Sequence, residues 1–204
     1  MGNNDIYRLM LQSSNNLTYT GSWNDHHLTA TAVYEVTSSE TRTIGITGNN
    51  LLTEGVGWWN VSMASSRDAN NGYNQWALMS GVVRVIYNYR DRYMLTGTFR
   101  VDGSSRFAKK KWGCFPSIAA AWTLSNEDFM KNVSTVQDIK LRASYGIVGS
   151  QAISPYATMG LMSATAYNFG TTSNFTGYWA NDIATPDLTW EKTKQFDLGW
   201  SFLV

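Results

Sequence analysis

The chain has 204 residues, a formal net charge of +1 at pH 7 and 15% charged residues, so no acidic or basic excess points to nucleic acid or an anionic partner. Its one cysteine, Cys114, excludes an internal disulfide and a multi-cysteine metal site, and its neighbours Phe115 and Pro116 favour a packing role. No stretch holds 18 consecutive apolar residues, which excludes a transmembrane helix.

Apolar and polar residues alternate strictly along most of the chain, which indicates half-buried β-strands. In the clearest case Tyr93, Leu95 and Phe99 share one face, while Thr96 and Arg100 share the other. Almost nothing is typical of a helix. We predict about seven strands, roughly over residues 11–23, 27–37, 75–90, 92–102, 113–124, 136–149 and 187–203.

The connections between these strands alternate in length. Residues 24–26 and 90–92 predict tight turns, and residues 125–135 predict a short connection with one helical turn. Long polar loops are predicted over roughly 38–74, 103–112 and 150–186. Aromatic residues gather near both ends of the strands, as in the interfacial belts of membrane proteins. The predicted fold is therefore an all-β antiparallel meander, with the short turns at one end and long loops at the other, as in bacterial outer-membrane barrels.

The strand pattern alone leaves a soluble alternative open. A carbohydrate-binding β-sandwich would bury its apolar faces against each other, whereas a barrel would turn the same faces toward lipid. A passive structural barrel or adhesin is a second alternative. We expect the environment of the apolar faces to discriminate a soluble module from a membrane wall.

Several sequence blocks resemble the SusC/RagA family of TonB-linked outer-membrane proteins. The resemblance spans roughly residues 76–202, and the blocks occur at the spacing of that family. They are Phe99–Phe107, Trp112–Ser117, Ala119–Trp122, Glu127–Met130, Leu141–Gly146, Gly149–Gln151, Pro186–Glu191 and Gln195–Gly199.

The resemblance implies a 22-stranded transmembrane β-barrel with an N-terminal plug domain and a segment that contacts TonB. The chain resembles about seven strands from the C-terminal half, which would form an open sheet because both remaining parts of the barrel are missing. Its start also lacks the basic and apolar regions of a signal peptide. We therefore expect a section of a longer outer-membrane protein, with no catalytic activity.

The family further implies an importer for oligosaccharides or peptides in the bacterial outer membrane. Its partners would be a SusD-like surface lipoprotein, the TonB complex through the missing N-terminal region, and membrane lipid. The resemblance implies no cofactor and no nucleic-acid partner. The basic run Lys109–Lys111 departs from the family pattern, and we hypothesise that it meets lipopolysaccharide phosphates.

Candidate metal ligands and catalytic residues are scarce in the sequence. His26 and His27 are adjacent and would point apart, which disfavours a metal pair, and no histidine is placed to act as a catalytic base. Asp102, Gly103 and Arg106 predict a braced loop base, with Gly103 permitting a turn and a charge-assisted bond joining the other two residues.

Aromatic residues in the long loops are the candidate contacts for a ligand or a protein cap. Packing of these loops on themselves is an equally weighted interpretation. The candidates are Trp58, Trp59, Tyr73, Tyr156, Tyr167, Phe175, Tyr178 and Trp179.

Overall fold

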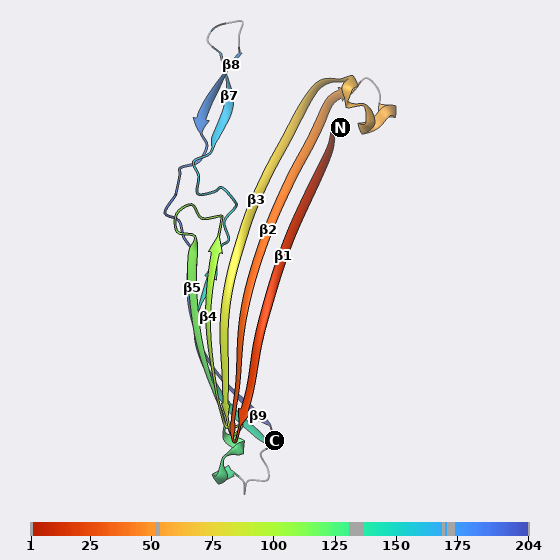
Figure 1. Ribbon diagram of the computed structural model, residues 1–204. Helices are drawn as coiled ribbons and strands as arrows, with labels where there is room; N and C mark the ends of the chain where they lie inside the picture. Colours follow the sequence, from red (N-terminus) through yellow and green to blue (C-terminus); the bar gives the residue numbers. More distant parts are fainter. Residues whose placement is uncertain (1, 52–53, 131–136, 169, 171–173, 204) are drawn as a thin grey trace. The chain divides into compact units, whose positions relative to one another are not determined.

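Seven strands form one open antiparallel sheet in the computed structural model, which describes residues 2–51, 54–130, 137–168, 170 and 174–203 (Figure 1). The order in the sheet is β1-β2-β3-β4-β5-β6-β9, so each strand pairs with its neighbour along the chain, apart from a separate β7–β8 hairpin inserted before β9. The predicted all-β meander of about seven strands is confirmed. The strands are β1 (Gly2–Trp23), β2 (His26–Leu51), β3 (Ala64–Tyr89), β4 (Tyr93–Ser104), β5 (Trp112–Thr123), β6 (Asp138–Ser150), β7 (Met162–Asn168), β8 (Asn174–Ala180) and β9 (Glu191–Leu203).

Helical structure among the described residues is confined to 3₁₀ segments. They are η1 (Glu54–Met63), η2 (Leu124–Asn126) and η3 (Asp128–Met130). None of the described helices has the length and apolar character that a membrane crossing requires.

The chain folds as two compact units. Unit 1 contains Met1–Gln12 and Thr37–Ala77, and unit 2 contains Ser13–Val36 and Leu78–Val204. Strands β1, β2 and β3 therefore contribute one part to each unit, whereas β4 to β9 belong to unit 2.

The predicted loop over 38–74 is wrong over most of its length, because β2 continues to Leu51 and β3 begins at Ala64. Strand β1 likewise begins at Gly2 rather than near residue 11. The extensions of β2 and β3 carry polar side chains on both faces, and that of β1 carries apolar side chains on both faces, so all three lack the alternation on which the prediction depended. The threonines of β2 favour extended backbone, and the ladder of backbone hydrogen bonds needs no apolar face.

The other predicted connections differ less. The loop over 103–112 is shorter at its start, because β4 reaches Ser104, and β9 begins at Glu191 rather than near residue 187. The predicted loop over 150–186 contains the β7–β8 hairpin, in which Tyr167 pairs with Phe175.

The two tight turns of unit 2 are bonded to each other, near the same end of the strands (Figure 1). Asn24, Arg90 and Asp91 have φ values of 52°, 53° and 50°, in the left-handed region that tight hairpins require. The Arg90 N–H donates to the Asp25 carbonyl at 2.8 Å, and its Nε donates to the Asp25 carboxylate at 2.7 Å. These bonds offset the cost of left-handed backbone at residues that carry a Cβ.

Candidate functional site

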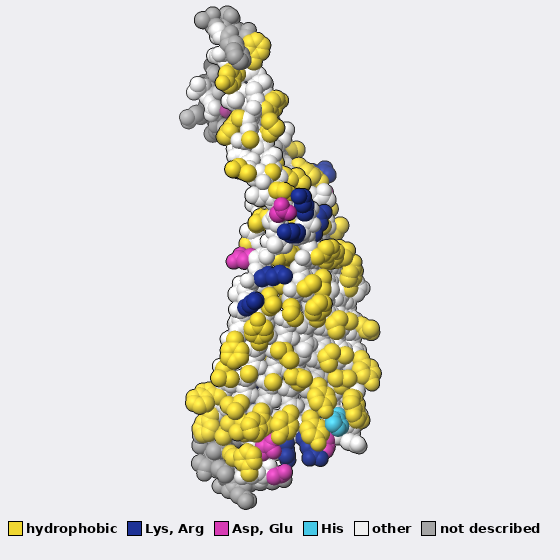
Figure 2. All heavy atoms as spheres, turned by 90° about the vertical axis from the view of Figure 1, so that its left-hand side faces the viewer, with side chains coloured by type: hydrophobic (Ala, Val, Ile, Leu, Met, Phe, Trp, Pro, Cys, Tyr) yellow, Lys and Arg dark blue, Asp and Glu magenta, His cyan; other side chains and the backbone are white. Residues whose placement is uncertain are grey.

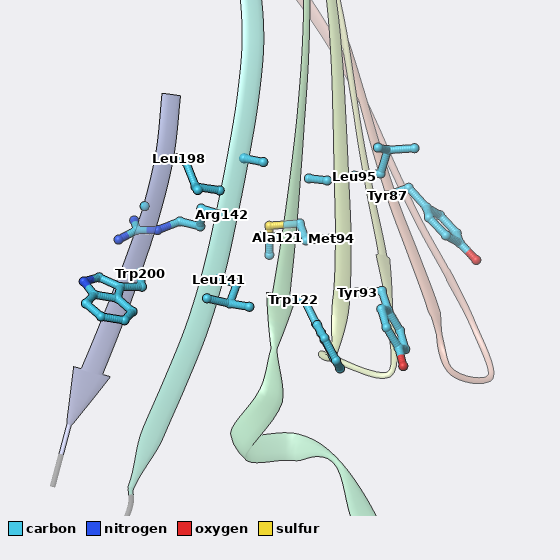
Figure 3. Close-up of a pocket in the computed structure, with 13 residues that line it drawn as sticks. Tyr87, Tyr93, Met94, Leu95, Ala121, Trp122, Leu141, Arg142, Leu198 and Trp200 are labelled. Atoms are coloured by element: carbon cyan, nitrogen blue, oxygen red, sulfur yellow. The ribbon is translucent and has the colours of Figure 1, made fainter. Parts of the chain in front are cut away.

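The strands of unit 2 place large apolar side chains on one face of the sheet, in rows that cross from β3 to β9. Each row follows from the antiparallel register, because paired residues point to the same face. In Figure 3 the labelled aromatic and leucine side chains of the first two rows line the same hollow. The rows are Tyr89–Tyr93–Trp122–Leu141–Trp200, Tyr87–Leu95–Ala120–Ala143–Leu198 and Val85–Gly97–Ile118–Tyr145–Phe196.

This apolar face is not covered by any second layer of the described chain. Leu95 is 46% exposed, Ile118 54% and Leu198 76%. Figure 2 shows hydrophobic side chains crowded over this side of the strands. The small side chains of Ala120 and Ala143 leave an open hollow of about 810 Å³ between the larger residues. Exposure on this scale contradicts the sandwich alternative, in which these side chains would be buried.

The opposite face of the same strands is polar. Asp197 accepts hydrogen bonds from Gln195 at 3.1 Å and from Ser144 at 3.4 Å. Nearer the long connections, the Arg100 guanidinium donates to the Asp102 carboxylate at 2.7 Å. One sheet therefore separates a wide apolar surface from a surface built for water or polar ligands.

Aromatic rings stack in a row near the tight turns of unit 2. The His26 ring lies 6.0 Å from Trp23 and 4.8 Å from Tyr89. The row continues through Tyr93, whose ring is 6.4 Å from Tyr89 and 6.3 Å from Trp122. Such a row presents apolar ring bodies to one side and polar ring atoms to the other.

The polar atoms of this row converge on Glu127, which lies between η2 and η3. Its Oε1 accepts hydrogen bonds from the Tyr93 hydroxyl at 2.6 Å and from Trp122 Nε1 at 3.0 Å. Its Oε2 accepts from Arg92 Nη1 at 3.1 Å, and the same guanidinium also donates to the Asp128 carboxylate. These bonds fasten the β5–β6 connection to Arg92, which directly precedes β4, to the first residue of β4 and to the end of β5. The hydrogen bonds from Tyr93 and Trp122, together with the Arg92 charge, lower the pKa of Glu127.

Replacing Glu127 with glutamine is expected to lower the thermal unfolding temperature of the full-length protein at neutral pH, because Arg92 then loses its charge-assisted bond. A carboxylate with a lowered folded-state pKa stabilises the fold above the ordinary glutamate range, and this stabilisation is lost as pH falls through the lowered pKa. The difference between wild type and Glu127→Gln should therefore shrink on acidification.

Asp128→Asn is the matched control for this prediction, since Asp128 binds the same guanidinium but its side chain is 69% exposed. Its effect at neutral pH should be the smaller of the two. Equal effects of the two variants, or a Glu127→Gln difference that does not change with pH, would contradict the role given to Glu127.

The predicted loop-bracing residues occupy the base of the long connections, but their partners differ from the expectation. Asp102 is bonded by Arg100 of its own strand, while Arg106 Nη1 donates to the carbonyl of Ile153 at 3.0 Å. The expected Asp102–Arg106 bond is thus replaced by a bond from Arg106 to another loop. Asp102 lies within β4 beside Arg100, which reaches it directly, whereas Arg106 lies beyond the strand end.

Gly103 does not form the predicted turn, because it lies within β4, opposite Trp112 of β5. A Cβ at this position would lie 2.7 Å from the Trp112 ring. The glycine is therefore needed for close approach of the indole, rather than for a special backbone conformation.

A small hydrophobic core, which was not predicted from the sequence, closes the loop base. Phe107, Phe115 and Trp190 are 1%, 6% and 6% exposed, and the Trp190 ring lies 5.3 Å from each phenyl ring. Trp190 Nε1 also donates to the Lys111 carbonyl at 2.9 Å. All three aromatic residues fall in the resembling blocks, which was the available signal.

Two of the candidate contact aromatics lie in unit 1 rather than in a long loop. Trp59, in η1, is 80% exposed, and Tyr73, in β3, is 55% exposed. The side chain of Trp58 lies outside the described residues.

The remaining candidates lie in unit 2, on or before the β7–β8 hairpin. Tyr156 precedes the hairpin, is partly buried and has a φ of 66°. Pairing places Tyr167 opposite Phe175 and Ser163 opposite Trp179, so these three aromatic residues share one face of the hairpin. Their exposures are 56%, 54% and 53%.

Tyr178 lies on the other face of the hairpin, opposite Ala164, and is 68% exposed. The structure thus brings three of the eight candidates together on one exposed surface. We call it the hairpin aromatic face, and it consists of Tyr167, Phe175 and Trp179.

Comparison with known proteins gives consistent matches along the chain. A family model described as "TonB dependent receptor-like, beta-barrel" matches residues 2–204. TonB-dependent receptor P3 of Formosa agariphila is 35% identical over 189 residues, which are 92% of this chain and 19% of that protein. TonB-dependent receptor SusC of Bacteroides thetaiotaomicron is 35% identical over 163 residues, which are 75% of this chain and 16% of that protein.

Solved structures also match. A structure of the RagAB peptide transporter superposes with a TM-score of 0.87 at 23% identity, covering 98% of this chain and 22% of that chain. The chain spans about a fifth of the length of the curated relatives that it matches.

Proposed function

Because the chain belongs to the TonB dependent receptor-like β-barrel family, we propose that it supplies barrel wall and surface loops to an importer in the bacterial outer membrane. The predicted resemblance to SusC/RagA proteins is confirmed by the match to SusC and by the fold shared with RagAB. The observation that carries the proposal is the single sheet with one exposed apolar face and one polar face. The apolar face meets lipid, and the polar face lines the lumen.

The edges of the sheet support a closed barrel. Strands β1 and β9 are the outermost strands of the sheet. An unpaired strand edge in hydrocarbon costs several kcal/mol per unsatisfied backbone group. Both edges therefore pair with further strands of the same barrel, of which the chain forms one section.

The hairpin aromatic face is the candidate contact for an oligosaccharide or peptide, or for a SusD-like lipoprotein that caps the importer. Three rings at 53–56% exposure on one face of a short hairpin offer flat apolar surfaces beside polar ring atoms. Such surfaces suit sugar rings and peptide side chains equally, so both substrate classes enter the test below. Energy would come from the TonB complex acting on a plug domain of the same importer.

Replacing Tyr167, Phe175 and Trp179 with alanine is expected to weaken ligand capture by the full-length protein at least roughly tenfold, since an aromatic contact contributes about 1 kcal/mol. Uptake and surface binding of fluorescent oligosaccharides and peptides by intact cells measure the effect. The matched control is Met162→Ala with Tyr178→Ala, which removes exposed side chains from the opposite face of the same hairpin.

A second measurement uses cells that lack the TonB complex. Uptake should then be lost while surface binding remains, because only translocation needs energy. Uptake that persists without TonB would favour a passive barrel. Equal losses in the triple variant and in its control would remove the hairpin aromatic face from the proposal while leaving the importer intact.

A further inference from the structure

Five of the seven lysines of the chain lie together in unit 2, where the β4–β5 connection meets the start of β9. We call this cluster the lysine patch, and all five side chains are exposed. It consists of Lys109, Lys110, Lys111, Lys192 and Lys194.

The two halves of the patch are about 80 residues apart in sequence, and backbone contacts join them. Thr189 Oγ1 donates to the Lys110 carbonyl at 3.3 Å, and Trp190 Nε1 donates to the Lys111 carbonyl at 2.9 Å. Trp190 is 6% exposed and directly precedes β9. The buried Trp190 side chain therefore holds together the two backbone segments that carry the lysines of the patch.

The charges of the patch are not neutralised within the described chain. Every ion pair among the described residues is made by an arginine, and none involves these five amines. Glu191 is the nearest carboxylate in sequence, but alternation in β9 directs it away from the side that carries Lys192. Asp187 lies a few residues earlier and forms no ion pair with the patch among the described residues.

The basic residues at the tight-turn end differ in this respect. Arg90 binds Asp25 at 2.7 Å, and Arg92 binds Glu127 at 3.1 Å. One end of the wall thus carries cations with carboxylate partners, whereas the other end carries cations that have no carboxylate partner among the described residues.

The patch borders the apolar face on the same side of the sheet. Strand β9 pairs with β6 without interruption from Glu191 to Leu203, so its side chains alternate throughout. Lys194 therefore shares a side with Leu198 and Trp200, whereas the Lys192 amine lies 6.0 Å from the centre of the buried Phe115 ring. Figure 2 shows several basic side chains, with acidic ones among them, on this face beyond the dense hydrophobic band and away from the tight turns.

The spacing along β9 fits the depth of a membrane. Trp200 of the first apolar row and Lys192 are eight residues apart in β9, which corresponds to roughly 27 Å along an antiparallel strand. With the usual strand tilt of about 40° this becomes roughly 20 Å across the membrane, against an apolar band of about 25 Å. The Lys192 backbone thus lies within roughly 5 Å of the far edge of the band, a gap that a lysine side chain can span, so the amines reach the headgroups of the leaflet opposite the tight turns.

We propose that the lysine patch binds the phosphate groups of the glycolipid in the outer leaflet, an inference that rests on the membrane-wall function proposed above. Ammonium groups are compact point charges that suit phosphate oxygens. Clusters of four to eight basic residues at a membrane surface bind anionic headgroups, each residue contributing substantially to affinity. The glycolipid phosphates supply the counter-charge that the chain does not provide.

The test uses the full-length protein in detergent and two probes: bisphosphorylated lipid A, and the same glycolipid with both phosphates removed. The dissociation constant of each is measured by titration with a fluorescent derivative. We expect the phosphorylated probe to bind at least roughly tenfold more tightly than the other. Replacing all five lysines with glutamine should remove that difference.

Two partial variants divide the patch. Lys109→Gln with Lys110→Gln and Lys111→Gln should lose part of the affinity, and Lys192→Gln with Lys194→Gln should lose another part. The control is Arg84→Gln with Lys140→Gln, which removes two positive charges elsewhere in the sheet and should bind as wild type. The advantage of the phosphorylated probe should decrease at high salt, because exposed charges are screened.

Three results would overturn the proposal: equal binding of the two probes, unchanged binding by the five-lysine variant, or an effect confined to one half of the patch. Loss of lipoprotein capture with unchanged glycolipid binding would instead identify a protein contact, and would also overturn it. Heat-modifiable gel mobility and ligand uptake of each variant should equal those of wild type. Failure of the wild-type protein to assemble in membranes would refute the importer itself, separately from the patch.

Discussion

Replacing Leu95 with arginine is expected to hinder membrane assembly of the full-length protein, at a cost of about 2–4 kcal/mol for a lipid-facing cation near the bilayer centre. Leu95 lies in the second apolar row, between Tyr87 and Ala120, and is 46% exposed on the apolar face. Rows lie on either side of it, so an arginine there cannot reach either membrane surface without crossing a neighbouring row of apolar side chains.

Thr96→Arg is the matched control, since it introduces the same side chain one residue further along β4. Thr96 pairs with Ile86 and Ala119 and points to the polar face. Its arginine would enter the lumen, where water solvates the charge. Heat-modifiable gel mobility of both variants reports the folded fraction. Equal defects would contradict the assignment of the apolar face to lipid, and with it the proposed function.

The strands of unit 2 were predictable because burial requirements differ between their two faces. Tyr93, Leu95 and Phe99 alternate with Thr96 and Arg100, and the same alternation appears in the observed register. This pattern did not predict whether the apolar side faces lipid or the interior of a protein. A sandwich and a barrel wall impose the same alternation, so only the exposure of residues such as Leu198 distinguished them.

The extended strands of unit 1 were not predictable by the same logic. Residues such as Thr41, Arg42 and Asn70 place polar groups on both faces, so periodicity carries no information there. Backbone hydrogen bonds between the strands hold these segments in extended conformation. Such bonds do not depend on side-chain type, so the sequence pattern does not reveal them. The start of β1 lacks alternation for a different reason, because its apolar residues Ile6, Tyr7, Leu9 and Met10 lie on both faces, and it was predicted to begin nine residues too late.

The hydrogen-bond and packing partners of residues in the loop base come from segments that are distant in sequence. Arg106 was expected to bind Asp102 because the two are close along the chain, but the strand end directs Arg106 to the carbonyl of Ile153. The aromatic core around Trp190 combines residues that are up to 83 positions apart, from Phe107 to Trp190. No local pattern predicts such a cluster, although the resembling blocks contained all its members.

Replacing Phe107 with alanine is expected to open this loop base while leaving the barrel wall assembled. The phenyl ring is 1% exposed and lies 5.3 Å from the Trp190 ring. Truncation of a buried phenylalanine costs about 3–5 kcal/mol, and here the cost falls on a local core that no other large cluster supports among the described residues. Uptake of ligand should fall strongly, because the hairpin aromatic face is carried by the connection that this core anchors.

Hydrogen exchange of the full-length protein measures the opening directly. The backbone of residues 104–111 and 185–190 should lose protection in Phe107→Ala, while β4 and β5 keep theirs and gel mobility stays heat-modifiable. Met162→Ala is the control, since that side chain is 66% exposed on the hairpin, outside the hairpin aromatic face, and removing it leaves no cavity. Unchanged protection at the loop base would mean that the hydrogen bonds of Arg106 and Trp190 hold it without the aromatic core. Loss of protection throughout the strands would mean that loop base and wall fold as one cooperative unit, so that the connections could not open while the barrel remains intact.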